Sequence, residues 1–120
     1  VENYQMGAGF TWVAEKENTI STTKQAWELA VAKIFSNQYD LIILDEINHI
    51  LNLHKTIGES VISPEQMVSL MTRKPQNVTL VLTGRYAHPM VIEAADTVSE
   101  VQCVKHHYKQ GIIAAKGIEY

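Results

Sequence analysis

The chain has 120 residues, of which 46% are hydrophobic and 19% charged, and its formal net charge is -3 at pH 7. Its length fits one domain over residues 1–120, with enough apolar residues for a core. Its lysines and arginines are scattered, which excludes the basic stripe of nucleic-acid-binding proteins. No segment approaches the roughly 18 apolar residues of a membrane span. Since the single cysteine, Cys103, fits a reducing compartment, we expect a cytoplasmic protein that binds neither nucleic acid nor membrane.

Hydrophobic periodicity predicts alternating helices and strands. Apolar residues recur at helical spacing after the potential N-caps Ser21 and Thr22. Ser63, Pro64 and Gln66 form the start signal of another helix. Short, nearly continuous apolar runs suit strands that are buried on both faces of a parallel sheet. The expected elements are a loop (1–18), a helix (21–35), a strand (39–44), a short helix or turn (47–53), a helix (64–74), a strand (78–82), a helix (89–95) and a strand (98–104).

This alternation is typical of an α/β domain with a parallel sheet. A polar cluster follows each predicted strand: Asp45 with Glu46, then residues 83–85, then Lys105 with His106. Ligands of open α/β sheets bind at the carboxyl ends of the strands. We therefore expect all three clusters to meet at one edge of the sheet and to form the functional site there.

Two of these clusters suit phosphate and its metal ion. Asp45 and Glu46 fit Mg²⁺, which prefers one or two carboxylates together with waters and phosphate oxygens. The alternative is a pair of solvated charges at the end of a strand. In the segment Thr83, Gly84 and Arg85, glycine permits a close backbone approach and arginine offers a forked donor for phosphate. The alternative here is a strand-to-helix turn with a surface arginine.

Other motifs carry less information. Phe10 and Trp12 follow a glycine-rich turn, and they could pack on a large flat ring or anchor the core. The five histidines lack the i, i+4 spacing of a zinc site, so we expect them to be solvated or hydrogen-bonded. No G-x-x-x-x-G-K-[ST] phosphate-binding loop occurs within the 120 residues.

Taken in order, these segments resemble the corrinoid adenosyltransferase family, which makes adenosylcobalamin in bacteria. The resemblance extends over nearly the whole chain, and each matching piece is weak alone but specific in this order. It rests on residues 6–12, 26–27, 39–48, 73–75, 80–85, 92–96, 104–106 and 116–120.

The resemblance implies a P-loop NTPase-like (RecA-like) fold of three layers, truncated at its N-terminus. The family's first strand and Walker-type loop have no counterpart among these residues. It implies transfer of the 5′-deoxyadenosyl group of ATP to the Co(I) of a reduced corrinoid, with Mg²⁺ present. It also implies a homo-oligomer, a dimer or larger, and a P-loop that a second chain could supply. The alternative is a non-catalytic remnant that binds a corrinoid or only forms oligomers.

The resemblance also implies residue roles. Phe10 and Trp12 match the aromatic residues that pack against the lower corrin face, and Arg85 matches a residue near the triphosphate. Asp45 and Glu46 match the acidic strand end that serves Mg²⁺, and with Arg85 they form the expected catalytic set. The expected ligand-binding residues are Gly9, Phe10, Thr11, Trp12, Asn48, Thr83 and Gly84.

Overall fold

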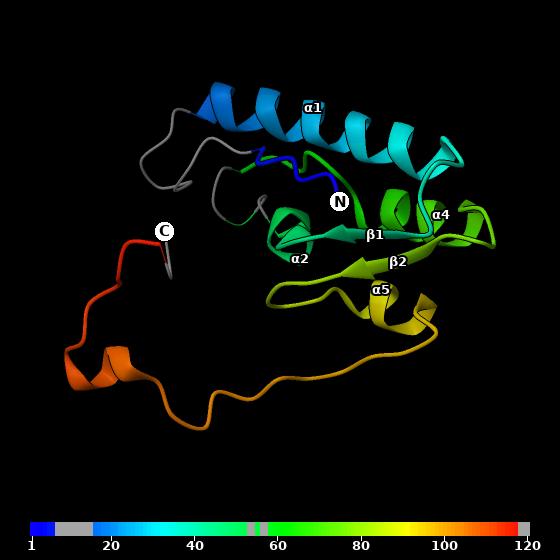
Figure 1. The fold of residues 1–120 in the computed structure, drawn as a ribbon. Helices are drawn as coiled ribbons and strands as arrows, with labels where there is room; N and C mark the ends of the chain where they lie inside the picture. Colours follow the sequence, from blue (N-terminus) through cyan, green and yellow to red (C-terminus); the bar gives the residue numbers. More distant parts are fainter. Residues whose placement is uncertain (7–15, 53–54, 56–57, 118–120) are drawn as a thin grey trace.

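The computed structural model describes residues 1–6, 16–52, 55 and 58–117. Helices and strands alternate along the chain, and the two strands lie side by side in the middle of the molecule (Figure 1). The elements are α1 (Lys16–Phe35), β1 (Leu41–Leu44), α2 (Ile47–Leu51), α4 (Pro64–Arg73), β2 (Thr79–Leu82), α5 (Pro89–Ala94) and the 3-10 helix η1 (His107–Gln110).

Strands β1 and β2 form a parallel sheet, in which Leu41 lies opposite Thr79 and Leu44 lies opposite Leu82. Helix α4 lies between them in sequence, which is the crossover that a parallel pair needs. The predicted α/β class with a parallel sheet is therefore confirmed. The core contains buried residues that come before, within and after this crossover in the sequence, namely Ile34, Ile47, Leu51, Ile62, Met67, Leu70 and Val91.

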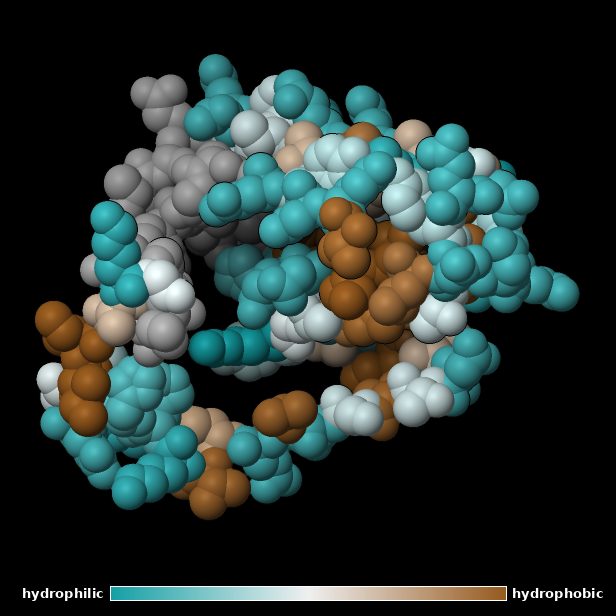
Figure 2. All heavy atoms as spheres, viewed as in Figure 1, coloured by the Kyte–Doolittle hydropathy of each residue, from teal (hydrophilic) through white to brown (hydrophobic). Residues whose placement is uncertain are grey.

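The sheet is buried on one face only, and the prediction of strands buried on both faces is wrong for the described residues. Ile42 and Leu80 point into the core, whereas Leu41 and Ile43 are 54% and 56% exposed. Figure 2 shows apolar side chains gathered on this open side below α1. A continuous apolar run fits both faces of a sheet, but here helices cover only the face that carries the core.

Local capping explains the helix boundaries. The capping box of α4 is formed as predicted: the N–H of Gln66 donates to Ser63 Oγ at 3.2 Å, and the N–H of Ser63 donates to Gln66 Oε1 at 2.8 Å. Helix α1, however, begins at Lys16 rather than near Ser21. Thr22 is therefore inside the helix, where its hydroxyl donates to the carbonyl of Asn18 at 2.8 Å instead of capping.

The predicted strand over residues 98–104 is wrong. The segment has no regular secondary structure, and Val101 and Val104 are 95% and 94% exposed. In Figure 1 the chain after α5 runs away from the sheet. A strand needs a neighbour to satisfy its backbone groups, and an apolar sequence alone does not provide one. Within the described parts of the chain, no helix is long and apolar enough to cross a membrane.

The N-terminal residues are attached to the start of the sheet by one polar cluster. The Glu2 carboxylate accepts hydrogen bonds from Tyr39 at 2.6 Å, from Tyr4 at 2.8 Å and from Lys33 at 2.9 Å. These bonds, that of Tyr39 most of all, lower the pKa of Glu2 to about 2. Hydrogen bonds from Tyr39, Tyr4 and Glu2 also raise the pKa of Lys33. The cluster therefore ties residues 1–6 to the end of α1 and the beginning of β1.

Candidate functional site

The carboxyl ends of β1 and β2 bring two of the three predicted polar clusters together. The Thr83 hydroxyl donates to Asp45 Oδ1 at 2.6 Å, and it accepts from the backbone N–H of Glu46 at 2.9 Å. The N–H of Thr83 in turn donates to the carbonyl of Leu44 at 3.2 Å. Because the strands are parallel and in register, both polar segments leave the sheet at the same edge. Thr83 thus fixes the orientation of the Asp45 carboxylate.

The backbone at this edge adopts unusual conformations. Glu46 and Tyr86 have φ angles of 56° and 60°, and Gly84 has φ 116°. A side chain at position 84 would place its Cβ 3.2 Å from both Asn48 Cβ and Glu46 Cα. Glycine is therefore required where the loop after β2 crosses the turn after β1. Left-handed backbone in non-glycine residues is costly and is concentrated at functional sites, which supports this edge as the site.

Asn48 lies beneath this crossing and is only 5% exposed. Its backbone N–H donates to the carbonyl of Thr83 at 3.2 Å, and its Nδ2 donates to the carbonyl of Gly84 at 3.5 Å. Its Oδ1 atom is buried and has no hydrogen-bond partner among the described residues. A buried acceptor without a donor costs about 1–3 kcal/mol, so Oδ1 is a local energetic cost of this crossing.

Asn52 belongs to the same site, although the sequence analysis did not select it. Its Nδ2 donates to the carbonyls of Asn48 and Tyr86, both at 2.9 Å. It therefore ties α2 to the loop that follows β2. The available signal was its spacing from Asn48, since residues four apart lie on one side of a helix.

The charged groups of the site are open to solvent. Asp45, Glu46 and Arg85 are all exposed, and among the residues described none of them forms a salt bridge. Nor does that part of the chain contain a cluster of three or more His, Cys, Asp and Glu side chains that could hold a metal ion. The donors available are the oxygens of the two carboxylates. They fit Mg²⁺, which completes its coordination with water and phosphate oxygens.

The remaining predicted residues fall into two groups. Gly9, Phe10, Thr11 and Trp12 lie outside the described residues. The third cluster was expected at a strand end, but the strand over 98–104 does not form. His106 instead caps η1, where its Nδ1 accepts from the N–H of Tyr108 at 3.1 Å. The structure therefore gives no sheet-based reason to place Lys105 and His106 in the site.

Comparison with known proteins identifies the class to which this α/β fold belongs. All of residues 1–120 match the family described as ATP:corrinoid adenosyltransferase BtuR/CobO/CobP. Over its whole length the chain is 35% identical to the corrinoid adenosyltransferase of Pseudomonas aeruginosa and 31% identical to that of Escherichia coli K12. Over 98% of its length it is 34% identical to a corrinoid adenosyltransferase of Sinorhizobium sp.

The chain therefore belongs to the ATP:corrinoid adenosyltransferase family, and the resemblance found in the sequence is confirmed. It spans 57%, 59% and 53% of the three relatives, respectively, or little more than half of each.

Proposed function

We propose that this chain takes part in corrinoid adenosylation, the transfer of the 5′-deoxyadenosyl group of ATP to the Co(I) of a reduced corrinoid, with release of triphosphate. Family membership supports the reaction class. The observation that carries the proposal is the joined strand end, where the Thr83 hydroxyl holds Asp45 beside the turn that contains Glu46. This places two exposed carboxylates where α/β sheets bind their ligands.

In this reaction Co(I) is the nucleophile, so the protein acts mainly by positioning and by stabilising charge. Asp45 and Glu46 would hold Mg²⁺, which when bound neutralises charge on the triphosphate. Arg85 follows on the neighbouring loop and would bind a phosphate oxygen with its forked guanidinium. Asn48 would support this loop from beneath, through its hydrogen bonds to the carbonyls of Thr83 and Gly84. In this proposal Phe10 and Trp12 contact the lower corrin face, together with the adjacent residues Gly9 and Thr11.

The phosphate-binding loop is the component that we propose comes from elsewhere. The 120 residues contain no Walker-type loop. One face of the sheet, which includes Leu41, Ile43 and Val81, is exposed and apolar. A further polypeptide segment that covers this face would complete a three-layer, P-loop NTPase-like fold. The segment would belong to the same protein or to a second chain, and several copies would assemble into an oligomer.

The resemblance leaves open a second candidate function. In that case the chain is a non-catalytic member of the family, which binds a corrinoid or only forms oligomers. It would keep the corrinoid-facing residues but would not bind ATP.

An absorbance assay separates the two candidates. The chain, together with the segment that supplies the phosphate-binding loop, is incubated with ATP, Mg²⁺ and chemically reduced cobalamin, and the cobalt spectrum is followed over time. Formation of adenosylcobalamin that is lost in Asp45→Asn and Arg85→Ala supports the enzyme. A corrin spectral shift without turnover, lost in Phe10→Ala and Trp12→Ala, supports the non-catalytic candidate. Failure of both turnover and corrinoid binding would contradict the enzyme and any corrinoid-binding role, and would leave only oligomer formation for this chain.

A further inference from the structure

Tyr86 lies on the loop that follows β2, directly after Arg85, and its backbone conformation is unfavourable for an aromatic residue. Its φ angle is 60°, which is in the left-handed region that bulky residues seldom adopt. The residue is 77% exposed, so burial of the ring does not compensate for this conformation. Strain of this kind persists only where the surrounding structure enforces it, and it is concentrated at ligand-binding sites.

Contacts on both sides of Tyr86 hold the loop in this shape. Asn52 donates from its Nδ2 to the Tyr86 carbonyl at 2.9 Å. Before Tyr86, the Thr83 hydroxyl ties the loop to Asp45 Oδ1 at 2.6 Å. After it, the His88 side chain caps the start of α5. The backbone that carries the ring is therefore fixed at the strand-end site by the fold itself.

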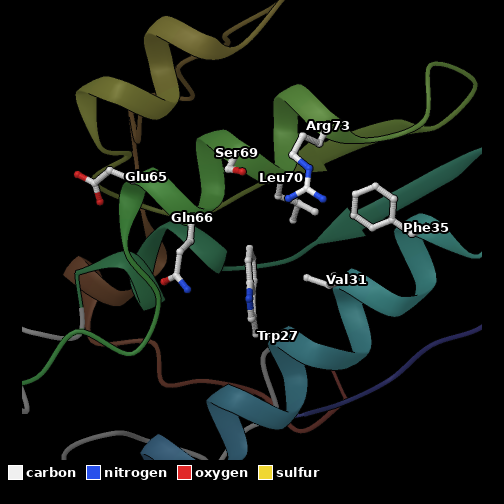
Figure 3. Close-up of a pocket in the computed structure, with 8 residues that line it drawn as sticks. All are labelled: Trp27, Val31, Phe35, Glu65, Gln66, Ser69, Leu70 and Arg73. Atoms are coloured by element: carbon white, nitrogen blue, oxygen red, sulfur yellow. The ribbon is translucent and has the colours of Figure 1, made fainter.

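The Tyr86 ring is without a partner in the described part of the chain, where its side chain takes part in no hydrogen bond, ring stacking or cation–π contact. Other exposed rings are differently placed. Phe35, which is 42% exposed, lies beside Arg73 in the groove between α1 and α4, with the guanidinium carbon 6.0 Å from the ring centroid (Figure 3). Lys33 Nζ lies over the ring of Tyr39 at 5.1 Å. The face of the Tyr86 ring is thus open to a planar ligand.

We propose that Tyr86 is a substrate-binding residue, whose ring stacks on the base of the nucleotide. This inference rests on the proposed function, because it requires a nucleotide at the strand-end site. Every nucleobase has a flat π face, and an exposed aromatic ring stacks on it without a specific hydrogen bond. Because Arg85 and Tyr86 are consecutive on one fixed loop, they are placed to contact two parts of the same nucleotide, its phosphates and its base.

The base of the nucleotide is favoured over the corrin ring as the partner of Tyr86. The groups that suit a triphosphate with its metal ion, namely Arg85 and the carboxylates of Asp45 and Glu46, are at the same edge of the sheet as Tyr86. The residues that match the corrin contacts, Phe10 and Trp12, belong to a different segment of the sequence. Tyr86 therefore belongs with the nucleotide-binding residues.

Calorimetric titration tests this role, with the chain combined with the segment that supplies the phosphate-binding loop. The parent and each variant are titrated with ATP and with inorganic triphosphate, both in the presence of Mg²⁺. Tyr86→Phe keeps the ring and should bind ATP as the parent does. Tyr86→Asn lacks the ring and should bind ATP about tenfold more weakly, with an unchanged affinity for triphosphate, which has no base. Tyr108→Asn makes the same change at a tyrosine that is 73% exposed outside this loop, and it should leave both affinities unchanged.

Unfolding in urea separates a ligand-binding role of Tyr86 from a structural one. Asparagine adopts the left-handed conformation more readily than other non-glycine residues. Tyr86→Asn should therefore keep or raise the urea midpoint of the parent, although it loses affinity for ATP. A lower midpoint for this variant would mean that the ring stabilises the fold, and it would contradict the proposed role.

The titrations also distinguish failure of this inference from failure of the proposed function. An unchanged ATP affinity in Tyr86→Asn would overturn the inference alone, while weaker binding of both ligands in Asp45→Asn would still support the proposed function. Equal weakening of ATP and triphosphate in Tyr86→Asn would place its effect at the phosphates and overturn stacking on the base. Weaker binding of hydroxocobalamin with unchanged ATP binding would assign the ring to the corrinoid instead. A parent that binds neither ATP nor triphosphate would refute both the proposed function and this inference.

Discussion

Removing the Thr83 hydroxyl tests the strand-end site directly, through stability. Thr83→Val keeps the branched shape but deletes the group that donates to Asp45 and accepts from the N–H of Glu46. A neutral hydrogen bond contributes about 1 kcal/mol and one to a charged group about 1.5–3 kcal/mol. Because Asp45 and Glu46 are both exposed, water replaces much of each interaction. We therefore expect the variant to lose about 1–2 kcal/mol of unfolding free energy.

The assay is equilibrium unfolding in urea followed by circular dichroism. The matched control is Thr79→Val, which makes the same change at an exposed position of β2, the strand that Thr83 follows. Thr83→Ser is the second comparison, because it keeps a hydroxyl and should retain most of the parent's stability. Similar slopes for all four proteins would show that the variants unfold from comparable native states.

Two results would contradict the role of Thr83. The first is a Thr83→Val variant within about 0.5 kcal/mol of the parent, which is the range of ordinary surface substitutions. The second is a Thr79→Val variant that loses as much stability, since the effect would then belong to the strand and not to the hydroxyl. In either case the orientation of Asp45 would have to come from another contact.

Three further changes test other parts of the fold. Gly84→Ala should cost about 1–3 kcal/mol, because its Cβ meets crowded atoms at φ 116°, while Gly58→Ala, in open space, should cost less in the same urea unfolding. The hydrogen bond from Tyr39, above all, holds the pKa of Glu2 at about 2. Because folding lowers this pKa, the Glu2 carboxylate stabilises the fold fully above pH 4.5 and loses this effect as the pH falls through about 2. The difference in unfolding free energy between the parent and Glu2→Gln should therefore be largest above pH 4.5 and should vanish at low pH in acid titrations. Ser63→Ala should cost about 1 kcal/mol by removing the cap, seen as a lower urea midpoint.

The sequence predicted elements best where local chemistry decides them. The start of α4 follows from Ser63, Pro64 and Gln66, whose capping interactions need only neighbouring residues. The strand over 98–104 was wrong because strand formation depends on a partner strand, and the residues of the apolar run itself say nothing about one. For the same reason, an apolar run could not show that only one face of the sheet would be covered.

The site follows the same division between local and long-range causes. The meeting of Asp45 and Thr83 was predictable, because parallel strands end at the same edge of a sheet. The buried Oδ1 of Asn48, which has no hydrogen-bond partner in the described part of the chain, was not predictable, since it depends on how the Gly84 loop crosses the turn at Glu46. Asn52 was missed because its two acceptors are backbone carbonyls, and its spacing from Asn48 indicated only that the two residues lie on one side of a helix.

Among the described residues the sheet has only the strands β1 and β2, so the segment that covers its open face could also add a strand at an edge, next to the strand-end site. A strand added in parallel to a free edge of the sheet would end beside Asp45 and Thr83, and the loop after it would lie over the carboxylates. An antiparallel strand would instead bring its first residues there. Since a P-loop follows its strand, only the parallel arrangement places its N–H groups near the proposed Mg²⁺ ligands. The proposed enzyme therefore requires the added segment to pair in parallel with β1 or β2.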